Sequence, residues 1–308
     1  MKRKVFDAEF IRKYGILMVL VIMWVIMLAV SPTFRTVSNA VNILRQVAVN
    51  GILAIGMTFV IMTGGIDLTV GSLVAVAGVI SGSILVVHPE QVILAVLAGI
   101  VVCGLFGAMN GFFVAYMEVP AFVATLAGMT IARGFAYVYS DGKPYTLNSP
   151  KFRIIGQGMA PIIIFLAILL ICHIVLSKMK FGRYIYATGG NIKAAEASGV
   201  NTKKILMKVY ILAGTLSGIA GIVLASRTNS GQPAVGTGFE TDAIAAAVIG
   251  GTSMTGGIGT IPGTLVGILI IGTLNNSLNL LNVSSYYQQI IKGTVSYTHL
   301  TLPTICSV

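Results

Sequence analysis

Four asparagines near the end of the chain have a spacing that suggests a function. Asn275, Asn279 and Asn282 recur at positions i, i+4 and i+7, which places three amides on one helical face, with Asn276 beside them. Amides inside an apolar segment normally point into a helix bundle. There they either bridge neighbouring helices or line a wet pathway for a polar solute. The sequence leaves both interpretations open.

Asp67 is a single carboxylate between two long apolar runs, in the stretch MTGGIDLTVGS at 62–72. It follows Gly64 and Gly65 and directly precedes the next apolar run. A carboxylate at such a position can accept hydrogen bonds from the first free N–H groups of the following helix. We therefore predict that Asp67 caps a helix.

An internal repeat supports this structural interpretation. The segment MTGGIDLTVGSLV at 62–74 returns 192 residues later as MTGGIGTIPGTLV at 254–266, with eight of thirteen positions identical. Gly259 stands at the position of Asp67, so the same turn is used once without its carboxylate. The repeat indicates an internally duplicated bundle, a common feature of transporters. The predicted turn residues are Gly64, Gly65, Gly256 and Gly257.

The elements that must position these residues are membrane spans. Of 308 residues, 56% are hydrophobic and only 9% are charged, and the mean hydropathy is +0.93. A run of about 20 apolar residues crosses a bilayer. The run at 243–291 is divided in two by the glycine-rich segment at 250–263. We predict nine spans, at 14–34, 46–66, 68–89, 91–117, 119–140, 154–177 and 205–226, and two within 243–291.

The distribution of Lys and Arg predicts the topology. The net charge is +11, but the basic residues are segregated by loop rather than gathered on one soluble face, which argues against a nucleic-acid partner. Five lie before the first span and seven between the sixth and seventh, and six spans separate these segments. Both segments, and with them the N-terminus, are therefore predicted to be cytoplasmic. On this span count the two copies of the repeat run in the same direction.

Motifs for catalysis are missing from the sequence. No phosphate-binding G-x-x-x-x-G-K-[ST] loop, no H-E-x-x-H and no G-x-S-x-G occurs, and the three cysteines form no C-x-x-C pair. We predict no catalytic residue, no cofactor and no metal site, hence a transport subunit rather than an enzyme. Ion-coupled secondary transport of a small polar solute is the alternative. The sequence gives it little support, because such carriers usually need ionisable residues within the spans and few occur here.

Glycines recur four residues apart at several places in the apolar runs. Such pairs let helix backbones approach closely and indicate spans that pack on one another. The pairs are Gly107 with Gly111, Gly214 with Gly218, and Gly263 with Gly267.

Three motifs occur in a fixed order along the chain: TGGIDLTVGS, the basic segment GRYIYATGGNIKAAEASGVNTKKILMKVY at 182–210, and the glycine-rich region at 236–293. Together they closely resemble the membrane permease of ribose-type (monosaccharide) ABC importers, in the branched-chain amino acid/ribose permease superfamily. The likeness runs from about residue 34 to 293. It implies an all-α polytopic bundle, the ten-helix permease fold of the vitamin B12 importer kind.

The resemblance also implies partners and a mechanism. The chain would work as a homodimer in the lipid of the bacterial inner membrane. It would take a sugar such as ribose from a periplasmic or lipid-anchored sugar-binding protein and be driven by a separate cytoplasmic ATP-binding subunit. The implied mechanism is alternating access between two states of the bundle.

The resemblance further assigns roles to residues of this sequence. Within the cytoplasmic loop at about 178–204, residues 190–200 would form the coupling helix that contacts the ATPase. The coupling-helix residues are Gly190, Asn191, Ala194, Ala195, Glu196, Ser198 and Gly199. For the translocation pathway we select Asn275, Asn276 and Asn279, whose amides could hydrogen-bond passing hydroxyls weakly enough to release them.

The last residues depart from the family pattern. The permease domain is expected to span 1–293, after which the family continues into a final apolar span. Here the chain reads TVSYTHLTLPTICSV at 294–308, which is polar and broken by Pro303. We expect this tail to be a truncation or an assembly artefact, with the last helix missing or replaced.

Overall fold

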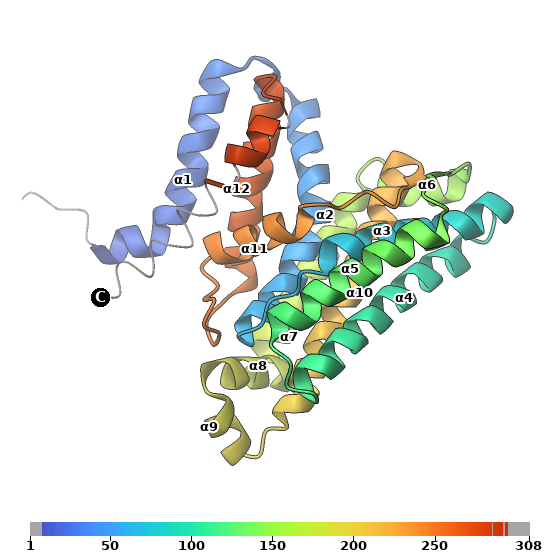
Figure 1. The fold of residues 1–308 in the computed structure, drawn as a ribbon. Coiled ribbons are helices and arrows are strands. Elements are labelled where there is room, and N and C mark those ends of the chain that lie inside the picture. The colour runs from blue at the N-terminus through green and yellow to red at the C-terminus, as the bar shows by residue number, and fades with distance from the viewer. Residues whose placement is uncertain (1–7, 285, 292, 295–308) are drawn as a thin grey trace, which may run out of the picture.

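The computed structural model describes residues 8–284, 286–291, 293 and 294. The predicted all-α polytopic bundle is confirmed, because seven helices of the described chain are long and apolar enough to cross a membrane (Figure 1). The seven helices are α2 (Val37–Met62), α3 (Val70–Val87), α4 (Val92–Ala115), α5 (Ala121–Tyr139), α7 (Ala160–Lys178), α10 (Thr202–Thr228) and α12 (Ile261–Leu280). Two short strands, β1 (Tyr145–Thr146) and β2 (Ser230–Gly231), pair antiparallel. Of the tail at 294–308, all but Thr294 lies outside the described residues.

Helix α1 and five shorter elements complete the bundle. They are α1 (Ala8–Val30), η1 (Thr33–Arg35), α6 (Pro150–Gly156), α8 (Lys180–Gly190), α9 (Ile192–Ala197) and α11 (Phe239–Ile249). The expectation of nine helical spans is wrong at α11. Its 11 residues extend about 16 Å, roughly half of the hydrocarbon core. The glycine-rich segment 250–260 continues from it as irregular backbone, which a membrane tolerates only where protein buries it.

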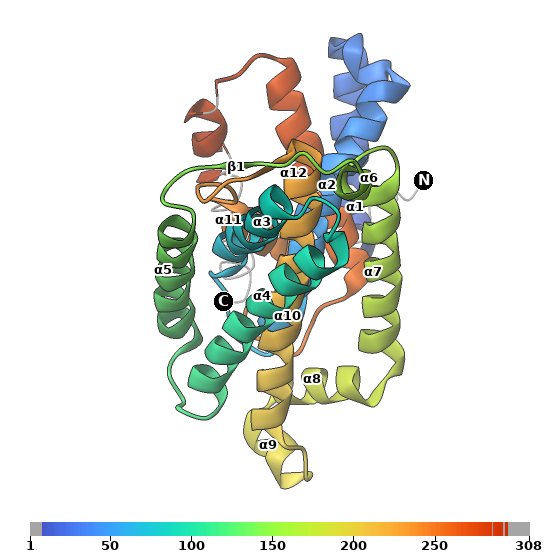
Figure 2. The same cartoon turned by 90° about the vertical axis from the view of Figure 1, so that its right-hand side faces the viewer.

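Helix α10 runs through the middle of the bundle, with α5 and α7 on opposite flanks (Figure 2). The predicted glycine pairs account for its close packing on α4. A Cβ on Gly107 would lie 3.2 Å from the Cα of Gly214, and one on Gly218 would lie 2.9 Å from the Cα of Ile100. In the same way, Gly267 of α12 faces the backbone of Ala246 in α11. Close backbone approach is therefore how these helices pack.

The two copies of the repeat run in the same direction. Helix α2 is antiparallel to α12, since Asn39 pairs with Asn276 near one end and Thr58 with Thr264 near the other. Helix α11 is also antiparallel to α12. Each copy thus consists of a descending helix, a glycine turn and an ascending helix in Figure 1. Both turns lie at the same end of the bundle, beside α8.

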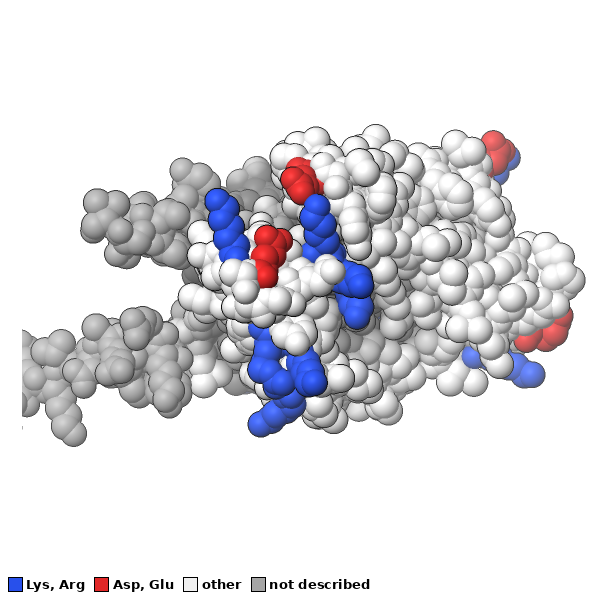
Figure 3. All heavy atoms as spheres, turned by 90° about the horizontal axis from the view of Figure 1, so that it is seen from below, with Lys and Arg blue, Asp and Glu red and all other residues white. Residues whose placement is uncertain are grey.

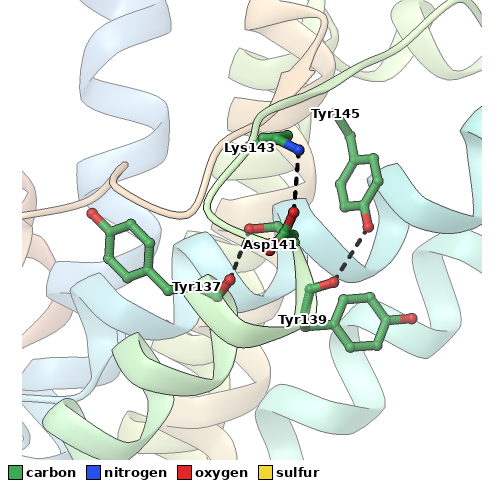
Figure 4. Close-up of polar contacts among 6 residues, drawn as sticks. Tyr137, Tyr139, Asp141, Lys143 and Tyr145 are labelled. Atoms are coloured by element: carbon green, nitrogen blue, oxygen red, sulfur yellow. Dashed lines mark hydrogen bonds and ion pairs between the residues drawn. The ribbon is translucent and has the colours of Figure 1, made fainter.

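The upper end of α5 carries a group of tyrosines. Helix α5 ends where Asp141 takes a left-handed conformation (φ 52°) and Gly142 donates its N–H to the carbonyl of Tyr137 at 2.9 Å. Lys143 forms an ion pair with Asp141 at 3.1 Å, and the hydroxyl of Tyr145 reaches the carbonyl of Tyr139 (Figure 4). Exposed tyrosines at a helix end are typical of a membrane interface.

Candidate functional site

A polar cavity of about 240 Å³ lies between α2, α10, α11 and α12. Its walls carry side-chain amides from two helices, an arginine, an aspartate and one aromatic ring. The polar and aromatic lining residues are Gln46, Asn50, Arg227, Phe239, Asp242, Asn275, Asn279 and Gln288. Groups that both donate and accept hydrogen bonds suit an uncharged solute with several hydroxyls.

The predicted pathway residues divide between two roles. Asn275 and Asn279 line the cavity, and the buried Oδ1 of Asn275 has no hydrogen-bond partner in the structure. Asn276 is buried instead, and its amide exchanges two hydrogen bonds with that of Asn39, at 2.9 and 3.1 Å. We therefore revise the expectation for Asn276, which bridges α12 and α2 rather than lining the cavity. The alternatives of bridging and lining are both realised, by adjacent residues.

Asn282 does not belong to the helical face. Helix α12 ends at Leu280, and Asn282 takes a left-handed conformation (φ 54°) just beyond it. Asparagine adopts this conformation more readily than most residues. The i, i+4, i+7 pattern was therefore wrong at its third member, because the helix stops before reaching it.

A second cavity of about 370 Å³ shares Gln46 and Arg227 with the first and opens at the end of the bundle where α6 lies. Arg45 also lines it and donates from Nε to the carbonyl of Gly158 at 2.8 Å. Arg227 in turn donates to the carbonyl of Arg45 at 3.3 Å. The two cavities are therefore neighbours, with Gln46 and Arg227 in the walls of both.

Asp67 is fully buried in the first turn. Its Oδ1 accepts hydrogen bonds from the backbone N–H and the hydroxyl of Thr69, at 2.9 and 2.5 Å. Helix α3 begins one residue later, at Val70, with Thr69 at its N-cap and no side-chain hydrogen bond to its first free N–H groups. Asp67 therefore closes the turn just before α3 and does not cap the helix as predicted. Asn110 of α4 donates to the Thr69 hydroxyl at 3.1 Å, and so extends this polar group to a second helix. Sequence reasoning missed Asn110 because it stands alone in an apolar run.

The predicted turn glycines have distinct structural reasons. Gly64, Gly256 and Gly257 take positive φ angles of 79°, 87° and 74°, a conformation that costs other residues free energy. Gly65 lies instead against the hydroxyl of Tyr210, and a Cβ there would approach it to 2.6 Å. Close approach, rather than a left-handed conformation, favours glycine at position 65.

The segment predicted as the coupling helix contains α9, at the tip of the molecule opposite α6 (Figures 1 and 2). Asn191 begins α9 by accepting the N–H of Ala194 at 3.0 Å, and Gly199 ends its turn with φ 82°. Glu196 accepts the hydroxyl of Thr202 at 2.5 Å, which ties α9 to α10. Of the predicted contact residues only Ala195 is buried, so α9 presents an exposed surface.

This end of the molecule is basic. Figure 3 shows Lys and Arg side chains gathered on the face that carries α8 and α9, with fewer acidic ones between them. A cleft of about 450 Å³ separates α9 from the first turn. At its edge Lys203 donates to Glu118 at 2.9 Å. This hydrogen bond holds the pKa of Glu118 below its usual value.

These features define a class of protein: a multi-pass membrane bundle with an amide-lined cavity toward one end and a protruding basic loop at the other is a membrane permease. The chain belongs to the family described as the permease component of branched-chain amino acid transport systems, whose model matches residues 39–298. It is thus a component of a transport system, in agreement with the prediction that it is not an enzyme.

Curated relatives fall within the same class. The chain is 44% identical to the ribose import permease protein RbsC of Escherichia coli K12, over 95% of this chain and 94% of that protein. RbsC of Bacillus subtilis 168 is also 44% identical, over 96% and 93%. The L-arabinose transport system permease AraH of E. coli K12 is 38% identical, over 92% and 88%. No solved structure matches the chain.

Proposed function

We propose that the chain is the membrane subunit of an ABC importer that moves a monosaccharide such as ribose across the bacterial cytoplasmic membrane. The observation that carries this proposal is the amide-lined cavity in a chain so similar to sugar permeases. The unpartnered Oδ1 of Asn275 can accept a hydrogen bond from a sugar hydroxyl. Asn279 can offer its amide N–H groups as donors, while its Oδ1 accepts from Gln288 at 2.9 Å.

The route begins at the end of the bundle where α6 lies, which we assign to the periplasm. A sugar-binding protein would deliver its ligand there, above Arg45 and Arg227. The amides of Asn275 and Asn279 would then hold the sugar weakly, because a tight site slows release. Asn276 would keep α2 and α12 in register behind them.

At the opposite end, residues 190–200 would contact a separate cytoplasmic ATP-binding subunit. Helix α9 is exposed, capped at both ends and surrounded by basic residues, as a docking element requires. The basic face and the N-terminus would be cytoplasmic, according to the positive-inside rule. Two permease copies would form a homodimer. ATP binding and hydrolysis would shift the population between two bundle states.

The test is uptake of radiolabelled ribose by cells that lack their own ribose importer and express the chain with candidate ATPase and binding-protein subunits. We expect uptake that requires all three and an ATPase that co-purifies with the tagged chain in detergent. Glu196→Trp should lose both ribose uptake and the co-purifying ATPase. Lys180→Trp, on the exposed start of α8, should keep both. Uptake without an ATPase, abolished by a protonophore, would favour the ion-coupled alternative instead.

A further inference from the structure

The end of helix α8 lies unusually close to the backbone of two other segments. A Cβ on Gly189 would overlap the carbonyl oxygen of Met62 and lie 2.6 Å from the backbone nitrogen of Gly257. Met62 is the last residue of α2, and Gly257 belongs to the second copy of the repeated turn. Gly189 therefore occupies a position where no side chain fits.

Hydrogen bonds hold the same three segments together. Gly257 donates its N–H to the carbonyl of Met62 at 2.9 Å, which joins the two copies of the repeat directly. The hydroxyl of Tyr186, one turn before Gly189 on α8, donates to the carbonyl of Gly259 at 2.7 Å. We call these five residues, Met62, Tyr186, Gly189, Gly257 and Gly259, the turn junction.

The next residue of α8 is a natural contrast. A Cβ on Gly190 would meet nothing within 4 Å, although Gly190 is adjacent in sequence and lies in the same helix. Only Asn191 separates it from α9. The turn junction is thus two residues from the element proposed to contact the ATPase.

We infer that the turn junction transmits movement of α9 to both copies of the repeat at once, with Gly189 as the positioning residue. The inference rests on the proposed function, because it assumes that the ATPase moves α9. It adds the route by which that movement enters the bundle.

The physical basis of this inference is the tight packing of the three backbones. Packed backbones without intervening side chains cannot absorb a displacement by rotamer changes, so a shift of α8 must move the carbonyl of Met62 and the N–H of Gly257. Met62 ends α2, and the second turn leads into α12. Asn50 of the cavity lies near the middle of α2, and Asn275 lies toward the far end of α12. A small shift at the turn junction therefore reaches the cavity walls as movement of whole helices.

The experiment compares Gly189→Ala with Gly134→Ala in the full chain, co-purified with its ATPase and reconstituted in liposomes with the binding protein. Gly134 of α5 is the control, because a Cβ there would meet nothing within 4 Å. The ratio of radiolabelled ribose transported to ATP hydrolysed is measured with magnesium ATP. We expect Gly189→Ala to lower this ratio at least about fivefold, with ATP hydrolysis maintained, and Gly134→Ala to leave it unchanged. An equal effect of both substitutions, or none of either, would overturn the inference.

Tyr186→Phe covers the case in which Gly189→Ala does not fold. It removes only the hydroxyl that reaches Gly259, and half-buried Tyr186 keeps its ring. We expect a reduction of about two- to fivefold in ribose transported per ATP, at wild-type amounts of assembled complex. Tyr184→Phe, an exposed tyrosine of the same helix, is the control. A wild-type ratio in Tyr186→Phe would contradict the inference. Failure of the wild-type complex to transport ribose would contradict the proposed function itself.

Discussion

The two copies of the repeated turn, at 62–74 and 254–266, reach the same shape by different chemistry. In the first copy a buried carboxylate, Asp67, accepts the N–H of Thr69 just before α3. In the second copy Gly259 stands at that position, and the hydroxyl of Thr260 accepts the N–H of Gly263 in the first turn of α12. The glycine backbone is shared, but the carboxylate of the first copy closes the turn before α3, whereas the hydroxyl of the second copy caps α12 itself.

The reason for the difference is the neighbour that each copy meets. A Cβ on Gly259 would lie 2.8 Å from the Cγ of Met62 and 2.9 Å from the Cγ2 of Thr252. No space for a carboxylate exists there, because Met62, the first residue of the first copy, and Thr252 fill it. The two turns pack on one another, and such packing allows only one of them to carry the larger group. The repeat is therefore symmetric in backbone and asymmetric in side chains.

The largest expected effect comes from disturbing the backbone conformation that the two turns share. Gly256→Ala must keep a positive φ, which costs an alanine about 1–2 kcal/mol. Its Cβ would also lie 2.7 Å from the carbonyl oxygen of Gly189. Overpacking of this kind adds about 1–3 kcal/mol. Gly251→Ala is the matched control, since Gly251 has φ 89° but nothing within 4 Å of its Cβ position. Thermal unfolding in detergent should give a clearly lower midpoint for Gly256→Ala. Equal midpoints would show that the contact with α8 is not tight.

The next effect comes from making the two turns alike. Gly259→Asp places a crowded carboxylate where Ile261, unlike Thr69, offers no hydroxyl. We expect a loss of about 2–4 kcal/mol, from overpacking and burial of an unpaired polar group. Gly259→Ala separates the two contributions, because it keeps the crowding and omits the charge. The unfolding midpoint is again the measurement. An Asp variant as stable as the Ala variant would contradict the expected cost of burying an unpaired polar group.

Much of this asymmetry could be predicted from the sequence, and some of it could not. The repeat and the glycine turns are local patterns, so the sequence contains them. Asp67 was predicted to cap α3, but it closes the turn one residue earlier, a difference that depends on where the helix begins. The length of α11 was overestimated, because hydropathy counts apolar residues and does not register that glycines end the helix at Ile249. The cavity was only partly predictable. Asn275 and Asn276 are neighbours of the same type, and only the position of Asn39 on another helix separates their roles.

The pairing of Asn39 with Asn276 gives the third prediction, because it connects α2 of the first copy to α12 of the second. Asn276→Leu leaves the buried amide of Asn39 unpaired, which costs about 1–3 kcal/mol. Asn39→Leu should cost a similar amount, and the double variant clearly less than the sum. A double-mutant cycle of unfolding midpoints measures this coupling. Strict additivity would mean that the two amides do not bridge the copies.

Asn275→Leu is the contrasting variant on the same helix. Its side chain lines the cavity, and its Oδ1 has no hydrogen-bond partner among the described residues. We therefore expect an unchanged unfolding midpoint but ribose uptake reduced about tenfold, the loss of one useful hydrogen bond of about 1.4 kcal/mol. Uptake assays in cells with matched amounts of permease provide the measurement. A variant that loses stability and keeps uptake would place Asn275 in the packing rather than in the pathway.

The smallest expected effect tests whether the charge of Asp67 matters. Asn and Asp side chains close the same kind of turn by accepting a backbone N–H two residues on, and the amide oxygen of Asp67→Asn can still accept the N–H of Thr69 as Oδ1 does now. We expect less than about 0.5 kcal/mol of change and normal uptake, whereas Asp67→Ala, which has no acceptor, should cost about 1 kcal/mol. If Asp67→Asn instead abolished uptake while its unfolding midpoint stayed normal, the ionisable group itself would be required. Only the first copy carries that group, so the difference between the turns would then belong to the transport mechanism, and ion coupling would return as an explanation.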